Sequence, residues 1–365
     1  MSWFIIENID TVDSPALVVY KERIQQNIQH AVDMIKDINK LRPHVKTNKI
    51  SEVCKIMLDA GIIKFKCATI AEAEMLALIK APDVLLAYQP VGPKANRLRQ
   101  LVTAYPQTHF SCLVDNIGAA QYLSDIFKEH NLVIDVYIDI NSGMNRTGIA
   151  PAYALQLFEA IHLLPGIHMA GLHAYDGHIR DTSLSERQHK SDDAFKKVMI
   201  LAETIESITK QPVNIVAGGS PTFPTHIKRH VECSPGTFVF WDWGYKHALP
   251  DEPFEYAALV ITRVVSIIDE ETICTDLGHK SVAAENPLPR VYFLNDEQVT
   301  PVSQSEEHMV AKVADSSKYK IGDVLYGVPL HICPTVALYN SAIVIEKKNA
   351  VDEWAVIARD RKINI

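Results

Sequence analysis

Short apolar runs rich in β-branched residues alternate with amphipathic stretches between about residues 20 and 240. Such runs are typical of buried strands, and a spacing of three to four between apolar positions is typical of helices that cover a sheet. The pattern predicts eight strands, over Leu41–Thr47, Phe65–Thr69, Val84–Tyr88, His109–Val114, Val133–Ile140, Ile167–His173, Val213–Ala217 and Thr237–Trp241. It also predicts intervening helices, including Lys21–Lys40, Ser51–Ala60, Ala71–Ile79, Ala95–Tyr105 and Ala194–Thr209.

Strands that alternate with helices indicate an α/β fold with parallel strands, because a parallel pair needs a crossover connection. Eight such units favour a (β/α)8 TIM-type barrel, since this strand count allows closure and the length is typical of a barrel. A doubly wound open sheet is the alternative fold.

The pattern changes after about residue 250, where strand-like runs follow one another with little helix between them. These runs are Tyr256–Ile268, Thr272–Asp276, Val324–Val328, Ala342–Ile345 and Trp354–Ala358. We therefore expect a barrel over residues 14–245, followed by a mainly β C-terminal domain over residues 250–365. Residues 1–13 are too few to fold alone, and we expect them to add a strand to the β domain.

Composition narrows the function classes. The chain is 47% hydrophobic and 22% charged, with a net charge of −8 and the two signs interspersed. No basic surface suited to nucleic acid is expected. The sequence shows neither a signal peptide nor an apolar run long enough to span a bilayer, and its six cysteines form no CxxC pair. We expect a cytoplasmic protein that binds neither nucleic acid nor membrane.

A barrel places its functional groups at the carboxyl ends of its strands. Lys46 ends the first predicted strand, where burial can lower a lysine's pKa and let the amine attack a carbonyl. Arg146 lies between Gly143 and Gly148, in a turn that can aim the guanidinium at an anionic oxygen. Taken singly, each also suits an ordinary solvent-facing position.

Three further clusters carry candidate chemistry. His173, Tyr175 and His178 follow the sixth strand and suit acid–base or ring-stacking roles, although buried structural positions are commoner for such residues. The glycine-rich segment Ala217–Thr222 follows the seventh strand, where many barrels bind phosphate, and Ser234–Thr237 can complete the cradle. His331 and Cys333, at alternate positions, suit a borderline metal such as Zn²⁺ with ligand positions left open; a buried cysteine beside a chance histidine is the alternative.

Together these clusters match one family. The matching stretches are Asp13–Leu17, Arg42–Thr47, Ala68–Glu74, Gly143–Gly148, Glu306–His308 and His331–Thr335. Over nearly its whole length the chain resembles the D-threonine aldolase and D-serine dehydratase family of fold-type III pyridoxal-5′-phosphate (PLP) enzymes, whose N-terminal barrel is related to alanine racemase.

The resemblance implies a role for each motif. Lys46 would form the Schiff base with PLP, Arg146 would face its 3′-oxygen, and Tyr175 would pack at the cofactor as a catalytic residue. His308 is a further catalytic candidate, as an acid–base group or a substrate contact. The other implied PLP-binding residues are His44, Gly218, Gly219, Ser220, Thr222, Ser234 and Gly236. The implied ligands of a divalent metal (Zn, Mn or Mg) are His331 and Cys333.

Three positions depart from the family pattern. Asn48 stands where a histidine is expected, and Cys333 occupies a position that is aspartate in some aldolases. Ser234 stands near the expected place of the pyridine nitrogen, where relatives tend to have arginine or glutamine, and its hydroxyl supplies no carboxylate to protonate the ring. Such a cofactor is a weaker electron sink.

The function implied by the resemblance is a PLP- and divalent-metal-dependent lyase that cleaves D-3-hydroxy amino acids to glycine and an aldehyde. A D-serine or D-3-hydroxyaspartate dehydratase is the nearest alternative. An amino-acid racemase and a non-catalytic PLP carrier are further alternatives, which a metal pair disfavours. The resemblance also implies a small-molecule D-amino acid substrate and a head-to-tail homodimer.

Overall fold

The computed structural model describes residues 2–365 and divides the chain into two compact units. The barrel unit comprises residues 31–46, 54–236 and 360–365. The β unit comprises the described residues up to His30, residues 47–53 and residues 237–359. The domain boundaries expected from the sequence stay a prediction.

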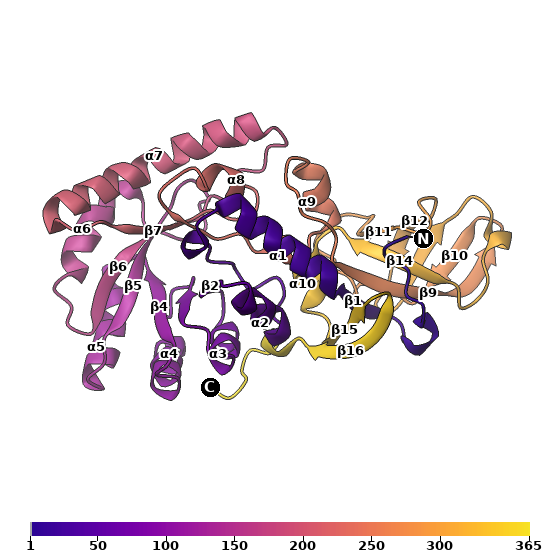
Figure 1. Ribbon diagram of the computed structural model, residues 1–365, viewed down its shortest axis with the longest axis horizontal. Coiled ribbons are helices and arrows are strands. Elements are labelled where there is room, and N and C mark those ends of the chain that lie inside the picture. The colour runs from indigo at the N-terminus through magenta and orange to yellow at the C-terminus, as the bar shows by residue number, and fades with distance from the viewer. Residues whose placement is uncertain (1) are drawn as a thin grey trace. The chain divides into compact units, whose positions relative to one another are not determined.

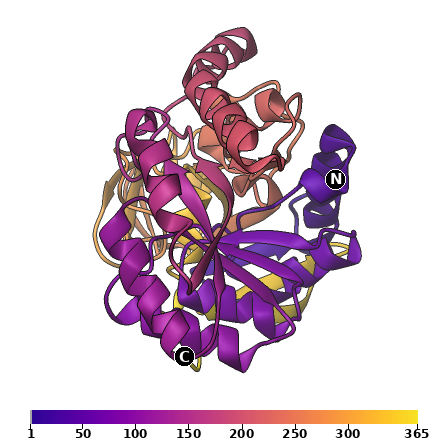
Figure 2. The ribbon, with the colours of Figure 1, turned by 90° about the vertical axis from the view of Figure 1, so that its left-hand side faces the viewer.

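Parallel strands in chain order form the sheet of the barrel unit, as the strands that fan out from a common centre in Figure 2 show. They are β2 (Lys64–Cys67), β3 (Asp83–Leu86), β4 (His109–Val114), β5 (Ile134–Ile140), β6 (Ile167–Ala174), β7 (Asn214–Ala217) and β8 (Glu232–Cys233). The helices between them are α3 (Ile70–Leu78), α4 (Pro93–Ala104), α5 (Ile117–Glu129), α6 (Pro151–Ile161) and α7 (Leu184–Thr209), and α8 (Phe223–His226) precedes β8. This alternation confirms the barrel-type fold predicted from the sequence.

The segment predicted as the first strand joins the two ends of this sheet through isolated bridges. Leu41 pairs in parallel with Cys233 of β8, and His44 pairs in parallel with Lys66 of β2. The backbone N–H of Val45 donates to the carbonyl of Lys66 at 2.9 Å. The segment therefore occupies the place of a barrel strand and delivers Lys46 at its carboxyl end.

The eighth strand was predicted at Thr237–Trp241, and this prediction is wrong. The strand is β8, Glu232–Cys233, and Thr237–Val239 form a 3₁₀ turn in which Phe240 donates its N–H to the carbonyl of Thr237. The residues from Thr237 to Trp241 are all buried. Burial produces the same continuous hydrophobic signal for a short strand and for a buried turn, so the pattern could not separate them.

Side chains inside the barrel form two contrasting layers. Leu85, Leu113, Tyr137 and Val216 make an apolar cluster. Polar side chains nearer the carboxyl ends of the strands include Lys66 on β2, Asp139 on β5 and His173 on β6. Alternation along each strand sends every second residue inward, so the polar layer lies at the mouth, where a barrel carries its functional groups.

The β unit is built on a mainly antiparallel sheet with the path β12-β13-β10-β9-β1-β15-β16, to which β14 and β11 are joined beside β9 (Figure 1). The expected strand within residues 1–13 is absent from the described residues 2–13, which hold a 3₁₀ turn at Ile9–Thr11; β1, Ala16–Tyr20, joins the sheet instead. The other strands are β9 (Ala258–Asp269), β10 (Thr272–Thr275), β11 (Val291–Phe293), β12 (Thr300–Gln304), β13 (Met309–Lys312), β14 (Val324–Pro329), β15 (Ser341–Glu346) and β16 (Asn349–Ala355). The remaining helices are α1 (Lys21–Ile35), α2 (Ser51–Asp59), α9 (Trp243–Ala248) and α10 (Ile332–Val336).

Among residues 2–365, none of the helices has the length and apolar character that crossing a membrane requires.

Candidate active site

A small pocket lies at the carboxyl ends of the barrel strands. The structure brings four residues predicted from the sequence into its lining: His44, Lys46, Arg146 and Tyr175. The remaining lining residues are Lys66, Ala87, Leu113, Asp139, Ile140, Asn141, Met144, Thr147 and His173.

Three cationic groups of this pocket, those of Lys46, Lys66 and Arg146, lie over the ring of Tyr175. The Nζ atom of Lys46 lies 5.7 Å from the ring centroid, and the guanidinium carbon of Arg146 lies 5.2 Å from it. The backbone N–H of Lys46 donates to Nδ1 of His44 at 3.2 Å, which fixes the chain just before the side chain enters the pocket. The arrangement offers an amine, a permanent cation and an aromatic face to one ligand.

The loop that carries Arg146 is folded back onto its own strand. Asn141 donates its N–H to the carbonyl of Ile149, and Ile149 donates to Asp139. Gly148 has a φ of +96°, and a Cβ added to it would lie 2.7 Å from the backbone nitrogen of Asn141. Only glycine suits this turn, because of both the positive φ and the close backbone approach.

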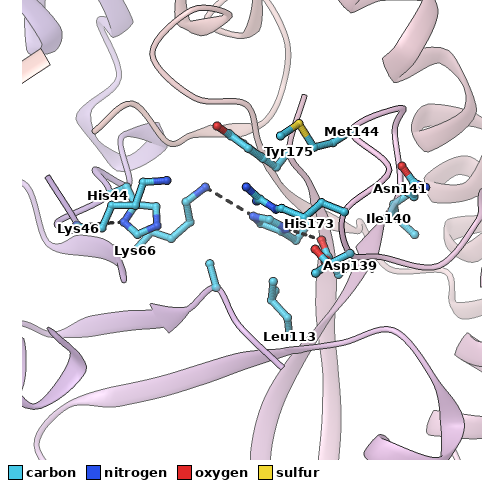
Figure 3. A pocket seen from close by; sticks show the side chains of 13 residues that line it. His44, Lys46, Lys66, Leu113, Asp139, Ile140, Asn141, Met144, His173 and Tyr175 are labelled. Carbon is cyan, nitrogen blue, oxygen red and sulfur yellow. Dashed lines mark hydrogen bonds and ion pairs between the residues drawn. The ribbon is translucent and has the colours of Figure 1, made fainter. Parts of the chain in front are cut away.

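The floor of the pocket holds a buried lysine that the sequence reasoning missed. The Nζ atom of Lys66, on β2, lies 3.5 Å from Nε2 of His173, and Nδ1 of His173 lies 2.7 Å from Oδ1 of Asp139 (Figure 3). Gln89 donates its side-chain N–H to the other oxygen of Asp139 at 2.9 Å. On β2 Lys66 alternates with Phe65 and Cys67 just as Lys64 does, so the sequence pattern did not single it out.

Electrostatics of this floor follow from its burial. Burial lowers the pKa of Lys66 to about 7, and the nearby Lys46 acts in the same direction, while Asp139 opposes it. Burial also lowers the pKa of His173, although the hydrogen bond that His173 donates to Asp139 opposes this. A neutral His173 therefore donates its Nδ1–H to Asp139 and presents the lone pair of Nε2 to the N–H of Lys66.

The loops after β7 and β8 meet beside Tyr175, as the sequence predicted for a phosphate cradle. A Cβ added to Gly219 would lie 2.9 Å from the Tyr175 ring, so this loop packs directly on the ring. The N–H of Gly236 donates to Oγ of Ser220 at 3.2 Å, which ties the two loops together. Glycines at such a position let backbone N–H groups approach an anion.

Buried polar side chains support the same loops. Thr222 donates its hydroxyl to the buried carboxylate of Asp176 at 2.7 Å, and His226 holds the other oxygen at 2.9 Å. The hydroxyl of Ser234 is buried without a hydrogen-bond partner among the described residues. An orphaned buried hydroxyl is costly unless a ligand completes it, so this site fits a polar group that accepts or donates a hydrogen bond there.

His331 and Cys333 lie in the β unit, His331 at the N-cap of α10 and Cys333 in its first turn. Nδ1 of His331 contacts Oε1 of Glu285 at 2.6 Å, which leaves Nε2 for a ligand. The Sγ atom of Cys333 lies 3.2 Å from the hydroxyl oxygen of Thr47 and 3.6 Å from that of Thr237. A carboxylate that orients the second nitrogen is the usual support of a metal-binding histidine.

The charges of His331 and Cys333 are coupled. Burial favours a neutral His331, but hydrogen bonding to Cys333 and to Glu285 outweighs it and raises the pKa of His331 to about 9. Burial alone would raise the pKa of Cys333, but the hydrogen bond to His331 and its charge outweigh burial, so the pKa of Cys333 is lowered. A thiolate and an imidazole suit a borderline divalent ion. No group of three or more His, Cys, Asp or Glu residues is arranged to hold a metal within residues 2–365.

His308 lies in the exposed turn between β12 and β13, also in the β unit. The backbone carbonyl of His308 accepts the N–H of Ser305 at 2.9 Å. Its catalytic role stays a prediction.

The protein thus combines two features. A lysine, Lys46, ends the segment that takes the place of the first barrel strand, and the β unit carries the pair His331 and Cys333. Residues 19–242 match the family described as "Alanine racemase, N-terminal domain", and residues 257–345 match the "Putative serine dehydratase domain". Because the first match covers more than half of the chain, the protein belongs to the alanine racemase N-terminal domain family.

Full-length relatives are enzymes. A D-threonine aldolase from Arthrobacter sp is 27% identical over 95% of this chain and 93% of its own. A D-threo-3-hydroxyaspartate dehydratase from Delftia sp. (strain HT23) is 23% identical over 94% and 97% of the two chains. The crystal structure of D-threonine aldolase from Filomicrobium marinum superposes with a TM-score of 0.89 at 26% identity and covers 98% of each chain.

Proposed function

We propose that the protein is a PLP- and divalent-metal-dependent lyase that cleaves D-3-hydroxy amino acids to glycine and an aldehyde. The observation that carries the proposal is the convergence of Lys46, Arg146 and Tyr175 on one pocket at the barrel mouth. An amine that can react with an aldehyde, beside a fixed cation and an aromatic face, is the donor set that PLP requires.

The residues present fit the cofactor. Lys46 would hold it through its aldehyde carbon, with Arg146 at its 3′-oxygen and Tyr175 against its ring. The N–H-rich loops of Gly218, Gly219 and Gly236, with the hydroxyls of Ser220 and Thr222, would hold the phosphate. His44 supports the backbone at Lys46. Bound PLP supplies an electron sink for charge that develops at Cα.

Ser234 tests this fit most sharply. Its hydroxyl is buried and unpartnered among the described residues, and it lies on the loop after β8 that the resemblance associates with the pyridine nitrogen. A neutral hydroxyl can donate a hydrogen bond to a ring nitrogen, but it supplies no charge to protonate it. The site therefore favours reactions in which little negative charge accumulates on the ring.

His331 and Cys333 are the proposed ligands of the divalent metal. They would hold the ion, and such an ion would supply a Lewis acid for the 3-hydroxyl oxygen of the substrate. Glu285 orients His331 for that role. His308 is proposed as an acid–base group or substrate contact, and the active assembly is proposed to be a head-to-tail homodimer.

A dehydratase that converts D-serine or D-3-hydroxyaspartate is the second candidate. Cys333 favours it, because some aldolases have aspartate at this position, whereas the aldolase is favoured by the 27% identity over 95% of the chain. Both reactions need a proton transfer at Cα and activation of the 3-oxygen, so the same pocket serves either.

The test supplies the purified protein with PLP and either Mn²⁺ or Zn²⁺, and then with D-threonine or D-serine, with and without EDTA. Glycine and acetaldehyde from D-threonine, lost on chelation, support the aldolase. Pyruvate or 2-oxobutyrate with ammonia supports the dehydratase. Bound PLP with neither product overturns the lyase proposal and favours a racemase or a PLP carrier. Lys46→Ala is the inactive variant, and exposed Lys55→Ala is its matched control.

A further inference from the structure

Two threonine hydroxyls contact the sulfur atom of Cys333, and the proposed function gives them no role. The hydroxyl oxygen of Thr47 lies 3.2 Å from Sγ of Cys333, and that of Thr237 lies 3.6 Å from it. Thr47 is 0% exposed and Thr237 is 5% exposed. They belong to separate turns of the β unit, one before α2 and one at Thr237–Val239, so two distant parts of the chain converge on one sulfur.

The contacts of Cys333 differ from those of Cys274, a buried cysteine on β10. Sγ of Cys274 donates to the backbone carbonyl of Thr275 at 3.7 Å, as a neutral thiol does. Sγ of Cys333 instead meets two hydroxyl groups, and each hydroxyl has a proton to donate. A thiolate accepts from both at once. The hydrogen-bonding groups around Cys333 therefore suit the form of cysteine that binds a metal.

The turns that carry the two threonines are held by hydrogen bonds of their own. The carbonyl of Thr237 accepts the N–H of Trp241 at 2.8 Å, which closes the turn at Thr237–Val239. In the turn that contains Thr47, Oδ1 of Asn48 accepts the N–H of Ile50 at 3.0 Å. Each hydroxyl is thus presented to the sulfur from a fixed backbone.

The backbone between the two proposed metal ligands is fixed as well. The carboxylate of Asp242, which is 2% exposed, accepts the N–H of Ile332 at 3.1 Å and the N–H of Tyr245 at 2.8 Å. Ile332 separates His331 from Cys333 in the chain. The sulfur and both hydroxyls therefore lie on segments that are each tied down, which favours a preset geometry over a chance contact.

We propose that Thr47 and Thr237 are positioning residues of the metal site, which donate their hydroxyl hydrogens to the Cys333 thiolate and orient it towards the divalent ion. This inference rests on the proposed function, because it takes Cys333 as a metal ligand. Glu285 supports His331 in the same way, so each of the two ligands has supporting contacts of its own.

Hydrogen bonds to a ligand sulfur have two measurable consequences. They hold the sulfur in the direction of the ion, and loss of such supporting contacts lowers metal affinity by about 10- to 100-fold. They also draw electron density from the sulfur, so their loss moves the sulfur-to-metal charge-transfer absorbance to longer wavelength. A threonine that only fills space produces neither effect when valine, which has a similar shape and no hydroxyl, replaces it.

The experiment titrates Co²⁺ into the full chain and follows the thiolate-to-cobalt absorbance band as a difference from the metal-free sample. Thr47→Val and Thr237→Val each remove one hydroxyl, and Thr47→Ser and Thr237→Ser keep it. We expect each valine variant to bind Co²⁺ about 10-fold or more weakly, with the band at longer wavelength, and each serine variant to stay near the wild type. Thr275→Val is the matched control, because the Thr275 hydroxyl is buried without a hydrogen-bond partner within residues 2–365.

Wild-type affinity and band position in both valine variants overturn the proposal. Equal weakening in the valine and serine variants also overturns it, because the effect would then come from packing. The two positions are independent, so one suffices if the valine variant at the other does not fold. A band that is absent from the wild type removes Cys333 from the metal site, and the metal part of the proposed function then fails. A band present in the wild type and unaltered in the valine variants overturns this inference alone.

Discussion

Arg42 and Glu232 form a buried ion pair, with Nε of the arginine 2.6 Å from Oε2 of the carboxylate. Arg42 lies in the segment that joins β2 to β8, and Glu232 begins β8. A second carboxylate, that of Asp83 at the start of β3, accepts from the same guanidinium at 2.5 Å. The pair thus fastens the segment that ends in Lys46 across the base of the barrel.

Replacing Arg42 by alanine should destabilise the barrel strongly. Among the described residues, Glu232 then keeps Lys64 as its one ion-pair partner, and breaking a buried ion pair in this way costs about 3–5 kcal/mol. Denaturant unfolding should show this loss in the free energy of unfolding. Lys21→Ala, which breaks the partly exposed pair with Glu346, is the control and should cost at most about 1 kcal/mol. Equal effects of the two substitutions would contradict the assignment.

A histidine–carboxylate cluster at the amino ends of the strands predicts a pH-dependent stability. The hydrogen bond to Asp135 and the nearby carboxylate of Asp83 raise the pKa of His109 to about 10. The folded state therefore binds this proton more tightly than the unfolded state, whose histidine titrates near 6.5. The stabilisation is complete below about pH 6.5 and is lost as the pH rises through about 10.

Thermal melts against pH should show this dependence. The Tm difference between the wild type and His109→Gln should be largest near pH 6 and should shrink towards pH 10. The ring of His109 is 56% exposed, so salt should weaken the effect. His189→Gln, on the exposed face of α7, is the control. A difference that stays constant with pH would show that the cluster does not titrate.

The contact between Gly219 and Tyr175 predicts a binding defect without a large change in stability. In Gly219→Ala the added Cβ would lie 2.9 Å from the ring, so Tyr175 must move off its position. Displacing a side chain from its rotamer costs about 0.5–1.5 kcal/mol, and we expect the dissociation constant for PLP to rise roughly threefold to tenfold. Fluorescence titration measures it. Gly118→Ala, whose Cβ would make only an ordinary contact at 3.6 Å, is the control.

Removal of the Cys333 thiol should separate metal binding from cofactor binding. Cys333→Ala leaves His331 as the only ligand of the proposed pair, so the affinity of the protein for the metal should fall by at least tenfold. Lyase turnover of D-threonine should fall with it, while the PLP absorbance band should persist. Elemental analysis and the absorbance spectrum measure the two effects, and Cys274→Ala on β10 is the matched control. Unchanged metal content would remove Cys333 from the site.

Much of the pocket could be predicted from the sequence, because its motifs follow predicted strands. Lys46, Arg146 and Tyr175 each lie just beyond a strand, and the ends of parallel strands meet at one mouth. Their convergence followed from the fold class alone.

Lys66 could not be distinguished from Lys64 in the same way. The two lysines lie on the same side of β2, but each has a partner far along the chain. Lys64 contacts Glu232, 168 residues later, and Lys66 contacts His173, 107 residues later. Only the folded barrel shows that one lysine has a direct carboxylate and the other has an imidazole. The eighth strand was misplaced for a related reason, since the buried run from Thr237 to Trp241 carries the same apolar signal as a strand.

The most direct test of the account identifies the residue that holds the cofactor. The protein is loaded with PLP, reduced with borohydride, digested and mapped by mass spectrometry. The account predicts the reduced cofactor on Lys46 in the wild type and in Lys55→Ala, and no labelled peptide in Lys46→Ala. A label on Lys66 or on another lysine, or no label in the wild type, would contradict it.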